Sequence, residues 1–228
     1  PPARMTVFRY EVTYADGRNV PVNVRWGEGV GTEGGGETRD VRIHHNVLFD
    51  VYWAAIQVGT WRGPVRDVEV YNNTIYHCGY LESNRPPAGG ICLSGNPSVG
   101  GPKNVRVYHN ILSGNRDYHI SVNRDVGLAR DNIRIERNLT DSPVDNTWGT
   151  TWVAHQGDFP VQGEPMWVDP QNRDFRLRPG SPAVDAGFLS LASRDADGTA
   201  PDLGAIPFRR PEVPIPPAGE GFALRVNV

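Results

Sequence analysis

Short segments in which apolar and polar residues alternate recur four times along the chain. In each segment two β-branched residues stand at alternate positions, and an asparagine follows three residues after the second of them. An alternation with a period of two predicts a β-strand with one buried and one exposed face. The strands are expected at residues 39–46, 66–73, 103–110 and 131–138, with Arg42, Glu69, Arg106 and Arg134 directed toward water.

Two further sets of short apolar segments recur between these strands. One set comprises residues 55–58, 90–93 and 119–122, and the other places Leu48, Ile75 and Leu112 two positions after the first three asparagines. Each unit therefore contains about three short strands and no helical periodicity. Strands that recur in every unit without a crossover helix stack in parallel when the chain winds around one axis. The pattern predicts an all-β fold made of stacked coils.

The asparagines of the four segments are expected to form a column. They are Asn46, Asn73, Asn110 and Asn138, separated by 27, 37 and 28 residues. A side-chain amide at an interior turn can donate to and accept from the same residue one coil above and below. The sequence therefore predicts a buried amide ladder that runs along the stack.

The segments "VRIHHNVL", "VEVYNNTI", "VRVYHNIL" and "IRIERNLT" resemble the repeats of the right-handed parallel β-helix, or pectin-lyase-like, superfamily. The stretch "NRDFRLRPGSPAVDAG" at 172–187, followed by "DLGA" at 202–205, resembles the C-terminal region of many bacterial members. The resemblance implies a right-handed parallel β-helix of about four to five coils. It leaves the reaction open, because the superfamily contains lyases, hydrolases and proteins without catalytic activity.

Four regions are expected along the chain. Residues 1–37 should form an N-terminal β-hairpin with its turn at Asp16 and Gly17 and a glycine-rich linker, and residues 38–143 the β-helix coils. Residues 144–210 should form an irregular C-terminal coil or cap, and residues 211–228 a proline-rich connector with a terminal strand. A lone hairpin is marginal in water, so the terminal strands should pair with each other, with the coils or with a second chain.

Charge and composition narrow the function classes. The 228 residues carry 23 Lys and Arg against 26 Asp and Glu, a net charge of −3. This balance argues against nucleic-acid binding, which needs a basic surface. No apolar run approaches the ~18 residues of a membrane helix, and no signal peptide is visible at the first residue. The two cysteines exclude a disulfide-rich scaffold and a four-cysteine zinc site, but a disulfide between Cys78 and Cys92 stays open.

The second strand set is the expected ligand-binding face, because members of the superfamily usually bind ligands along the outer face of one sheet. Alternation predicts that this face exposes small polar residues, including Gln57, Cys92, Ser94, Ser121 and Asn123. Aromatic and charged residues at its borders should add contacts to a saccharide; they are Trp53, Trp61, Tyr118 and Arg116.

Two catalytic arrangements are considered on this face. His119 with Arg124 could act as base and charge neutraliser in a β-elimination on a uronic acid, or His119 could be a surface histidine that is hydrogen-bonded across coils. Two of Glu82, Asp117 and Asp125 could provide the carboxylates of a glycosidase, or these residues could be solvated in loops. Whether the protein is an enzyme therefore remains open from the sequence.

The expected function is that of an extracellular or periplasmic bacterial protein that acts on a polysaccharide, as a lyase or a glycoside hydrolase. The alternative is a non-catalytic β-helix module for glycan binding or assembly. No nucleic acid, membrane or cofactor is expected as a partner, and no metal site is assigned. Calcium is considered only at Asp195, Asp197 and Asp202, which have the spacing of an oxygen-ligand loop but lack the EF-hand pattern. Trp148, Trp152 and Trp167 are expected to cover the open end of the stack.

Overall fold

A computed structural model places most of the repeat region and much of the C-terminal region. It describes residues 12–14, 30–31, 38–60, 63–80, 89–96, 98–123, 131–142, 152–154, 157–188, 195 and 198–210. Within these ranges the regular structure consists of β-strands and one single-turn 3-10 helix, η1 (Pro170–Asn172). The described chain is therefore all-β, as the alternation predicts.

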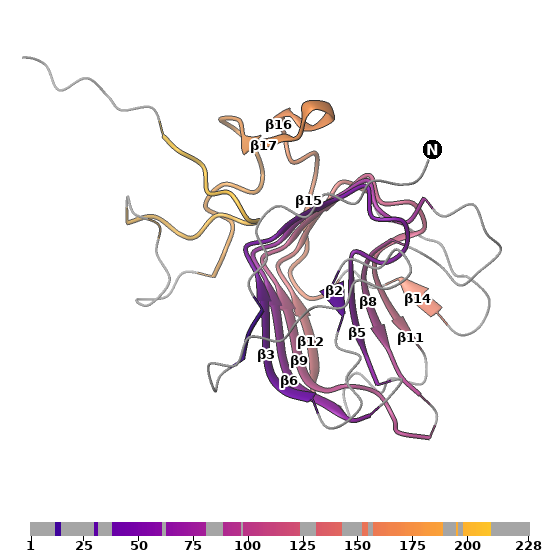
Figure 1. The fold of residues 1–228 in the computed structure, drawn as a ribbon. Helices are drawn as coiled ribbons and strands as arrows, with labels where there is room; N and C mark the ends of the chain where they lie inside the picture. The colour runs from indigo at the N-terminus through magenta and orange to yellow at the C-terminus, as the bar shows by residue number, and fades with distance from the viewer. Residues whose placement is uncertain are drawn as a thin grey trace, which may run out of the picture.

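Three five-stranded sheets contain the repeats (Figure 1). Sheet 1 has the order β1 (Val12–Tyr14), β3 (Thr38–His44), β6 (Val65–Tyr71), β9 (Lys103–Tyr108), β12 (Ile133–Glu136). Sheet 2 has the order β4 (Val47–Phe49), β7 (Thr74–Tyr76), β10 (Ile111–Ser113), β13 (Leu139–Thr140), β15 (Val161–Gln162). Sheet 3 has the order β2 (Val30–Gly31), β5 (Ile56–Gly59), β8 (Gly89–Ser94), β11 (Tyr118–Asn123), β14 (Trp152–Ala154).

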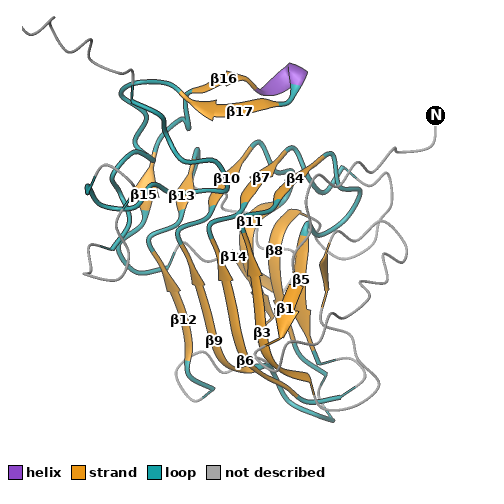
Figure 2. Cartoon of the chain, turned by 60° about the vertical axis from the view of Figure 1, so that its left-hand side comes forward, coloured by secondary structure: helices purple, strands orange, loops and turns teal. Residues whose placement is uncertain are grey.

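The chain visits the three sheets in the same order each time, and we call each passage a rung. Successive rungs are β3–β4–β5, β6–β7–β8 and β9–β10–β11, and equivalent strands pair in parallel. Corresponding residues are in register, so that Val41 pairs with Val68, and Val68 with Val105. Figure 2 shows the equivalent strands side by side.

The inward faces of the three sheets share one hydrophobic core. Its members include Val41, Val68 and Val105 from sheet 1, Leu48, Ile75 and Leu112 from sheet 2, and Ile56, Ile91 and Ile120 from sheet 3. These positions are the apolar positions of the sequence pattern, because a period of two directs alternate side chains to one face. The assignment of inward residues is confirmed.

The predicted amide ladder is present. Nδ2 of Asn46 donates to Oδ1 of Asn73 at 2.9 Å, and the same bond links Asn73 to Asn110 and Asn110 to Asn138, also at 2.9 Å. The backbone N–H groups of Asn46, Asn73 and Asn110 donate to the same three oxygens, at 2.9 to 3.1 Å. All four side chains are buried. The ladder therefore locks the register of neighbouring rungs at the corner between sheets 1 and 2.

Strands near the two ends of the stack run in the opposite direction. β1 pairs antiparallel with β3, and β14 pairs antiparallel with β11. β1 lies within the expected N-terminal hairpin; the rest of that hairpin and the terminal segment 211–228 lie outside the described residues. The structure also extends the coil further than expected, since Asp158 pairs with Glu136 and β15 pairs in parallel with β13. Asp158 and β15 lie within residues 144–210, which were expected to form an irregular C-terminal coil or cap.

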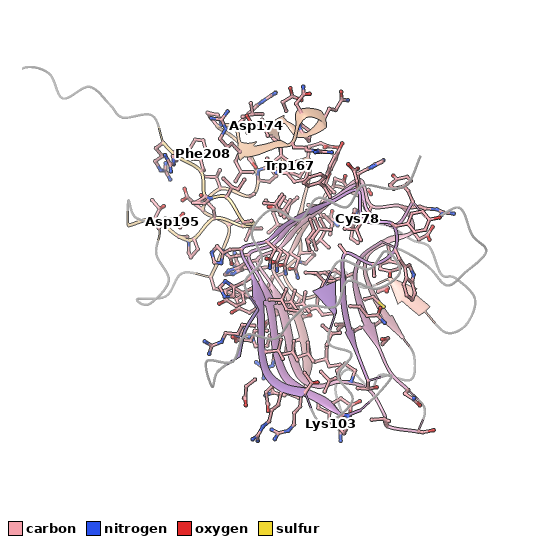
Figure 3. The ribbon with its side chains drawn as sticks, viewed as in Figure 1. Cys78, Lys103, Trp167, Asp174, Asp195 and Phe208 are labelled. Carbon is pink, nitrogen blue, oxygen red and sulfur yellow. The ribbon has the colours of Figure 1, made fainter. Side chains whose placement is uncertain are left out.

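The C-terminal region packs on the outer face of sheet 2. The strands β16 (Trp167–Asp169) and β17 (Asp174–Leu177) form an antiparallel pair. Their side chains join Phe49, Ile111 and Leu139 in a second hydrophobic cluster. Trp167 contacts Tyr76 and Phe175 edge-on, with ring centroids at 5.3 and 5.2 Å, so it covers this sheet instead of the end of the stack. Figure 3 shows Trp167 and Asp174 at the side of the molecule opposite to Lys103.

The "DLGA" segment is docked on the same face. The N–H of Gly204 donates to the carbonyl oxygen of His109 at 2.8 Å, and the N–H of Ala205 donates to Oγ1 of Thr74 at 3.0 Å. Gly204 has a φ of +87°, and a Cβ there would lie 2.6 Å from Cδ1 of Ile111. A glycine is needed because both the backbone conformation and the close approach exclude a side chain.

Candidate functional site

The predicted ligand-binding face of sheet 3 is buried. Gln57, Cys92 and Ser121 lie in register on adjacent strands, but their exposed fractions are only 2%, 4% and 1%. Alternation correctly places them on the face opposite to the core, but their expected exposure is wrong, because the period of a strand does not determine what covers its outer face. Part of the cover is the ring of Tyr118, which lies over Gly89 and clusters with Ala54 and Cys92.

Within the described part of the chain, three polar atoms on or beside this face meet no hydrogen-bond partner at normal distance and angle. They are the Tyr118 hydroxyl, Oγ of Ser121 and Nε1 of Trp53. Burial raises the pKa of Tyr118 well above its usual value, so that its phenol stays protonated. Of the other residues expected to bind the substrate, Trp61 lies outside the described residues, and Asn123 ends β11 with a side chain that is not described.

The two cysteines do not form a disulfide. Both side chains are buried. Cys78 belongs to the inner core, whereas Cys92 lies on the outer face of sheet 3. Burial raises the pKa of the Cys78 thiol to about 12, so the thiol remains protonated and unreactive at neutral pH.

His119 is part of a buried network that connects two rungs. Its Nε2 lies 2.8 Å from Oδ1 of Asp141 on the next rung, and its Nδ1 lies 3.2 Å from Nδ2 of Asn115. Burial raises the pKa of Asp141, but hydrogen bonds from His119, Ser113 and the Gly114 amide outweigh this effect and lower it to about 2. Both ring nitrogens are engaged, as in the interpretation of His119 as hydrogen-bonded across coils, although the ring is buried and not on the surface. A catalytic role, which requires a free nitrogen, stays a prediction.

The remaining predicted catalytic residues are brought together only in part. Asp117 is almost fully buried and lies 3.4 Å from the exposed Arg116, measured from Oδ1 to Nε. Glu82, Arg124 and Asp125 lie outside the described residues. The paired carboxylates of a glycosidase and the histidine–arginine pair of a lyase therefore both stay predictions.

The solvent-facing surface of the coils lies on sheet 1. Arg42, Glu69, Arg106 and Arg134 follow one another in register across β3, β6, β9 and β12, and none of them is buried. The expectation that they face water is confirmed. Arg42 pairs with Glu69 at 3.4 Å, and Arg106 pairs with Glu136 at 3.2 Å. Two of the three arginines of this row are thus each paired with a glutamate.

An aromatic column runs beside this charged row. The rings of His44 and Tyr71 stack with centroids 4.8 Å apart, and those of Tyr71 and Tyr108 stack at 5.0 Å. The guanidinium carbon of Arg106 lies 4.6 Å from the Tyr108 ring centroid. Burial raises the pKa of Tyr71, and raises that of Tyr108 to about 12. Both hydroxyls are therefore hydrogen-bond donors at neutral pH.

The predicted site does not include this column, although the sequence contains a signal for it. The residue after the second β-branched position is aromatic in three of the four segments, namely His44, Tyr71 and Tyr108. Equivalent positions of stacked repeats lie one above the other. The recurrence of aromatic residues at one repeat position therefore predicts an aromatic column on the outer face.

A second polar ladder borders the charged row. Nδ2 of Asn132 donates to Oδ1 of Asn104 at 2.8 Å, and Nδ2 of Asn104 donates to Oδ1 of Asp67 at 2.6 Å. The hydrogen bond from Asn104 lowers the pKa of Asp67. A shallow cavity of about 210 Å³ opens here, lined by Asp40, Arg42, Asp67, Glu69, Asn104 and Arg106. We call the charged row, the aromatic column and this cavity together the sheet 1 surface.

The carboxylates considered for calcium lie in the C-terminal region. Asp195 and Asp202, together with Asp185, place one oxygen each within 4.8 Å of one another. The oxygens of Asp202 accept the N–H groups of Asp185 at 2.8 Å and Phe208 at 2.5 Å, so this side chain organises the turn. Asp197 lies outside the described residues, and calcium binding stays a prediction.

Comparisons with known proteins do not assign the chain to a family. No protein-family model, curated protein or solved structure matches it at a significant level. Within the described ranges no helix is long and apolar enough to span a membrane.

Proposed function

We propose that the protein is a right-handed parallel β-helix that binds a polysaccharide along the sheet 1 surface, as an extracellular or periplasmic bacterial module. The order of the strands supports the architecture, because the chain returns to each sheet once per rung and pairs there in parallel. Crossover connections between parallel strands of one sheet are right-handed in almost all proteins, which supports the proposed hand.

The observation that carries the functional proposal is the stacked column of Tyr71 and Tyr108 beside the charged row. Parallel strands lie about 4.8 Å apart, so a sugar chain along the stack would meet an equivalent set of side chains at every rung. The tyrosine hydroxyls can donate to sugar oxygens, and guanidinium and carboxylate groups can bond neighbouring hydroxyls.

The paired charges favour a ligand rich in hydroxyl groups over a polyanion. Arg42 and Arg106 are each held by a glutamate, so neither is free to neutralise a charged polymer. The same ion pairs favour binding over cleavage, because a carboxylate that is paired with an arginine is poorly placed to exchange protons with a substrate. A lyase or hydrolase remains the alternative, with its site on sheet 3.

The test is a glycan array followed by calorimetry on the tightest polysaccharide. Tyr71→Ala should weaken binding about tenfold or more, because removal of one stacked aromatic typically costs 1–3 kcal/mol at a binding surface. Tyr52→Ala is the matched control, since Tyr52 is exposed but precedes β5 at the sheet 3 side. If only Tyr52→Ala weakens binding, the proposed surface is wrong. Release of unsaturated products or reducing ends would instead assign a lyase or a hydrolase.

A further inference from the structure

A second cavity lies between the C-terminal hairpin and the corner that follows sheet 2. It has a volume of about 240 Å³ and is lined by residues that include Phe49, Asp50, Tyr76, His77, Gln171 and Arg173. Figure 2 shows the β16–β17 hairpin and η1 above the strands β4, β7 and β10. Rung corners therefore supply one wall and the hairpin turn supplies the other.

The rung side of the cavity holds an aspartate–histidine pair. Asp50 and His77 occupy equivalent corners of adjacent rungs, with φ values of 53° and 52°. Nδ1 of His77 lies 2.8 Å from Oδ1 of Asp50, and the imidazole stacks on Tyr80 with centroids 4.0 Å apart. Both side chains are about half exposed, at 46% and 47%. The described residues offer no hydrogen-bond partner to Nε2 of His77, so this nitrogen is available to a ligand.

The hairpin side of the cavity holds an arginine without a carboxylate partner among the described residues. Arg173 ends η1 in the left-handed conformation, with a φ of 66°, and its N–H bonds the carbonyl oxygen of Pro170. Its guanidinium carbon lies 4.7 Å from the ring centroid of Phe49. Arg176 on the same hairpin differs, because Asp174 binds it through two hydrogen bonds of 2.8 and 2.5 Å. The guanidinium of Arg173 is thus held in place by a ring but is free to bind an anion.

We infer that this cavity binds a small hydroxylated monocarboxylate, of the size of a single sugar acid. A guanidinium binds a carboxylate through two parallel hydrogen bonds. Hydroxyl groups of the ligand can donate to Asp50 and bond Nε2 of His77, while Phe49 and Tyr76 contact its apolar face. Arg173 offers one positive charge to a ligand, and the negative charge of Asp50 faces the same cavity. A ligand with one negative charge is therefore favoured over a dianion, which Asp50 would repel more strongly. The volume is below the ~300–1,000 Å³ of pockets for drug-sized ligands, which limits the occupant to one small ring.

The test compares D-glucuronate with D-glucose, which differ at this site only in the carboxylate. Binding is followed by the NMR signals of the His77 imidazole, assigned by their loss in His77→Gln. We expect saturable shifts with glucuronate and at least about tenfold weaker binding of glucose, as for loss of a charged hydrogen-bonded pair. Arg173→Asn should reduce glucuronate binding to the level of glucose, and Arg173→Lys should retain part of the preference. Asparagine is chosen because it tolerates a left-handed φ.

Arg176→Asn is the matched control and should bind glucuronate like the unmodified protein, because Arg176 is paired with Asp174 outside the cavity. Equal affinities for glucuronate and glucose, or an unchanged preference in Arg173→Asn, would overturn the inference. Inorganic phosphate that binds more tightly than glucuronate would overturn the choice of a monocarboxylate. The outcome is independent of the sheet 1 surface, which lies on a different face of the coils.

Discussion

The amide ladder provides a sharp test of what holds the rungs together, because two of its members differ in the number of partners. Asn110 lies inside the column: its Nδ2 bonds Val70 O, Tyr108 O and Asn138 Oδ1, and its Oδ1 accepts Nδ2 and the backbone N–H of Asn73. Asn46 lies at the end of the column, and its Oδ1 accepts no hydrogen bond from the residues that the structure describes. Both side chains are buried, so burial alone predicts similar effects of substitution.

We predict that Asn110→Ala destabilises the protein by about 4 kcal/mol and Asn46→Ala by about 1 kcal/mol. Asn110→Ala leaves the buried backbone N–H of Asn73 without its acceptor, which costs about 1–3 kcal/mol, and removes the other bonds at a net cost of about 0.5–1 kcal/mol each. Asn46→Ala removes the two bonds that its Nδ2 donates, to His44 O and Asn73 Oδ1, but leaves no backbone N–H without its acceptor, because the Asn46 N–H still bonds Oδ1 of Asn73.

The measurement is the free energy of unfolding from urea denaturation, followed by circular dichroism and by tryptophan fluorescence. The two probes must give coincident transitions for the comparison to hold. Losses of stability that agree within about 0.5 kcal/mol would show that the column contributes only through packing, and would refute the hydrogen-bond reasoning.

Three further predictions concern the C-terminal dock and the buried contact between His119 and Asp141. His109 is buried with its Nε2 accepting the Phe188 N–H, and burial lowers its pKa from 6.5 to about 4. Stability should therefore fall by up to about 3 kcal/mol as the pH drops from 6.5 to 4, and urea titrations of His109→Gln should show a flatter profile in this range. The pKa of Asp141 is lowered from 3.8 to about 2, so the ionised carboxylate stabilises the folded state above pH 3.8, and this stabilisation is lost as the pH falls toward 2. Asp141→Asn should therefore reduce the loss of stability in acid titrations by about 2 kcal/mol. Gly204→Ala should lower the stability by about 2–3 kcal/mol, because a Cβ would clash with Ile111 at an unfavourable φ. Gly198→Ala has a similar φ of +83° and open space around it, so thermal melting should show a smaller loss, of about 1 kcal/mol; equal losses would exclude the clash as the cause.

The resemblance to the pectin-lyase-like superfamily remains a prediction, since no family model or solved structure matches the chain. The arrangement of the sheets agrees with it in one respect, namely that equivalent strands of successive repeats pair in parallel. The positions of the expected catalytic residues, unlike the pairing of the strands, do not follow from the repeats. They depend on which face of the stack is open, and the face on which they were expected is buried.

The sequence by itself determined the strands, their inward residues and the asparagine ladder. These features depend on a period of two and on residues that recur at equivalent positions, so they can be read along the chain. The conformation of Gly204 and the position of Trp167 could not be read in this way. Both depend on contacts with Ile111 and Tyr76, which lie about 90 residues away in the chain.

Only the tertiary structure decided which outer faces are available to ligands. The same alternation directs Gln57 and Glu69 away from the core, yet Gln57 is buried and Glu69 is accessible. The cavity with His77 and Arg173 likewise exists only because the C-terminal hairpin folds back on sheet 2. Periodicity along a strand specifies the direction of a side chain, whereas its neighbours across the outer face come from distant segments whose placement follows from the packing of the whole chain.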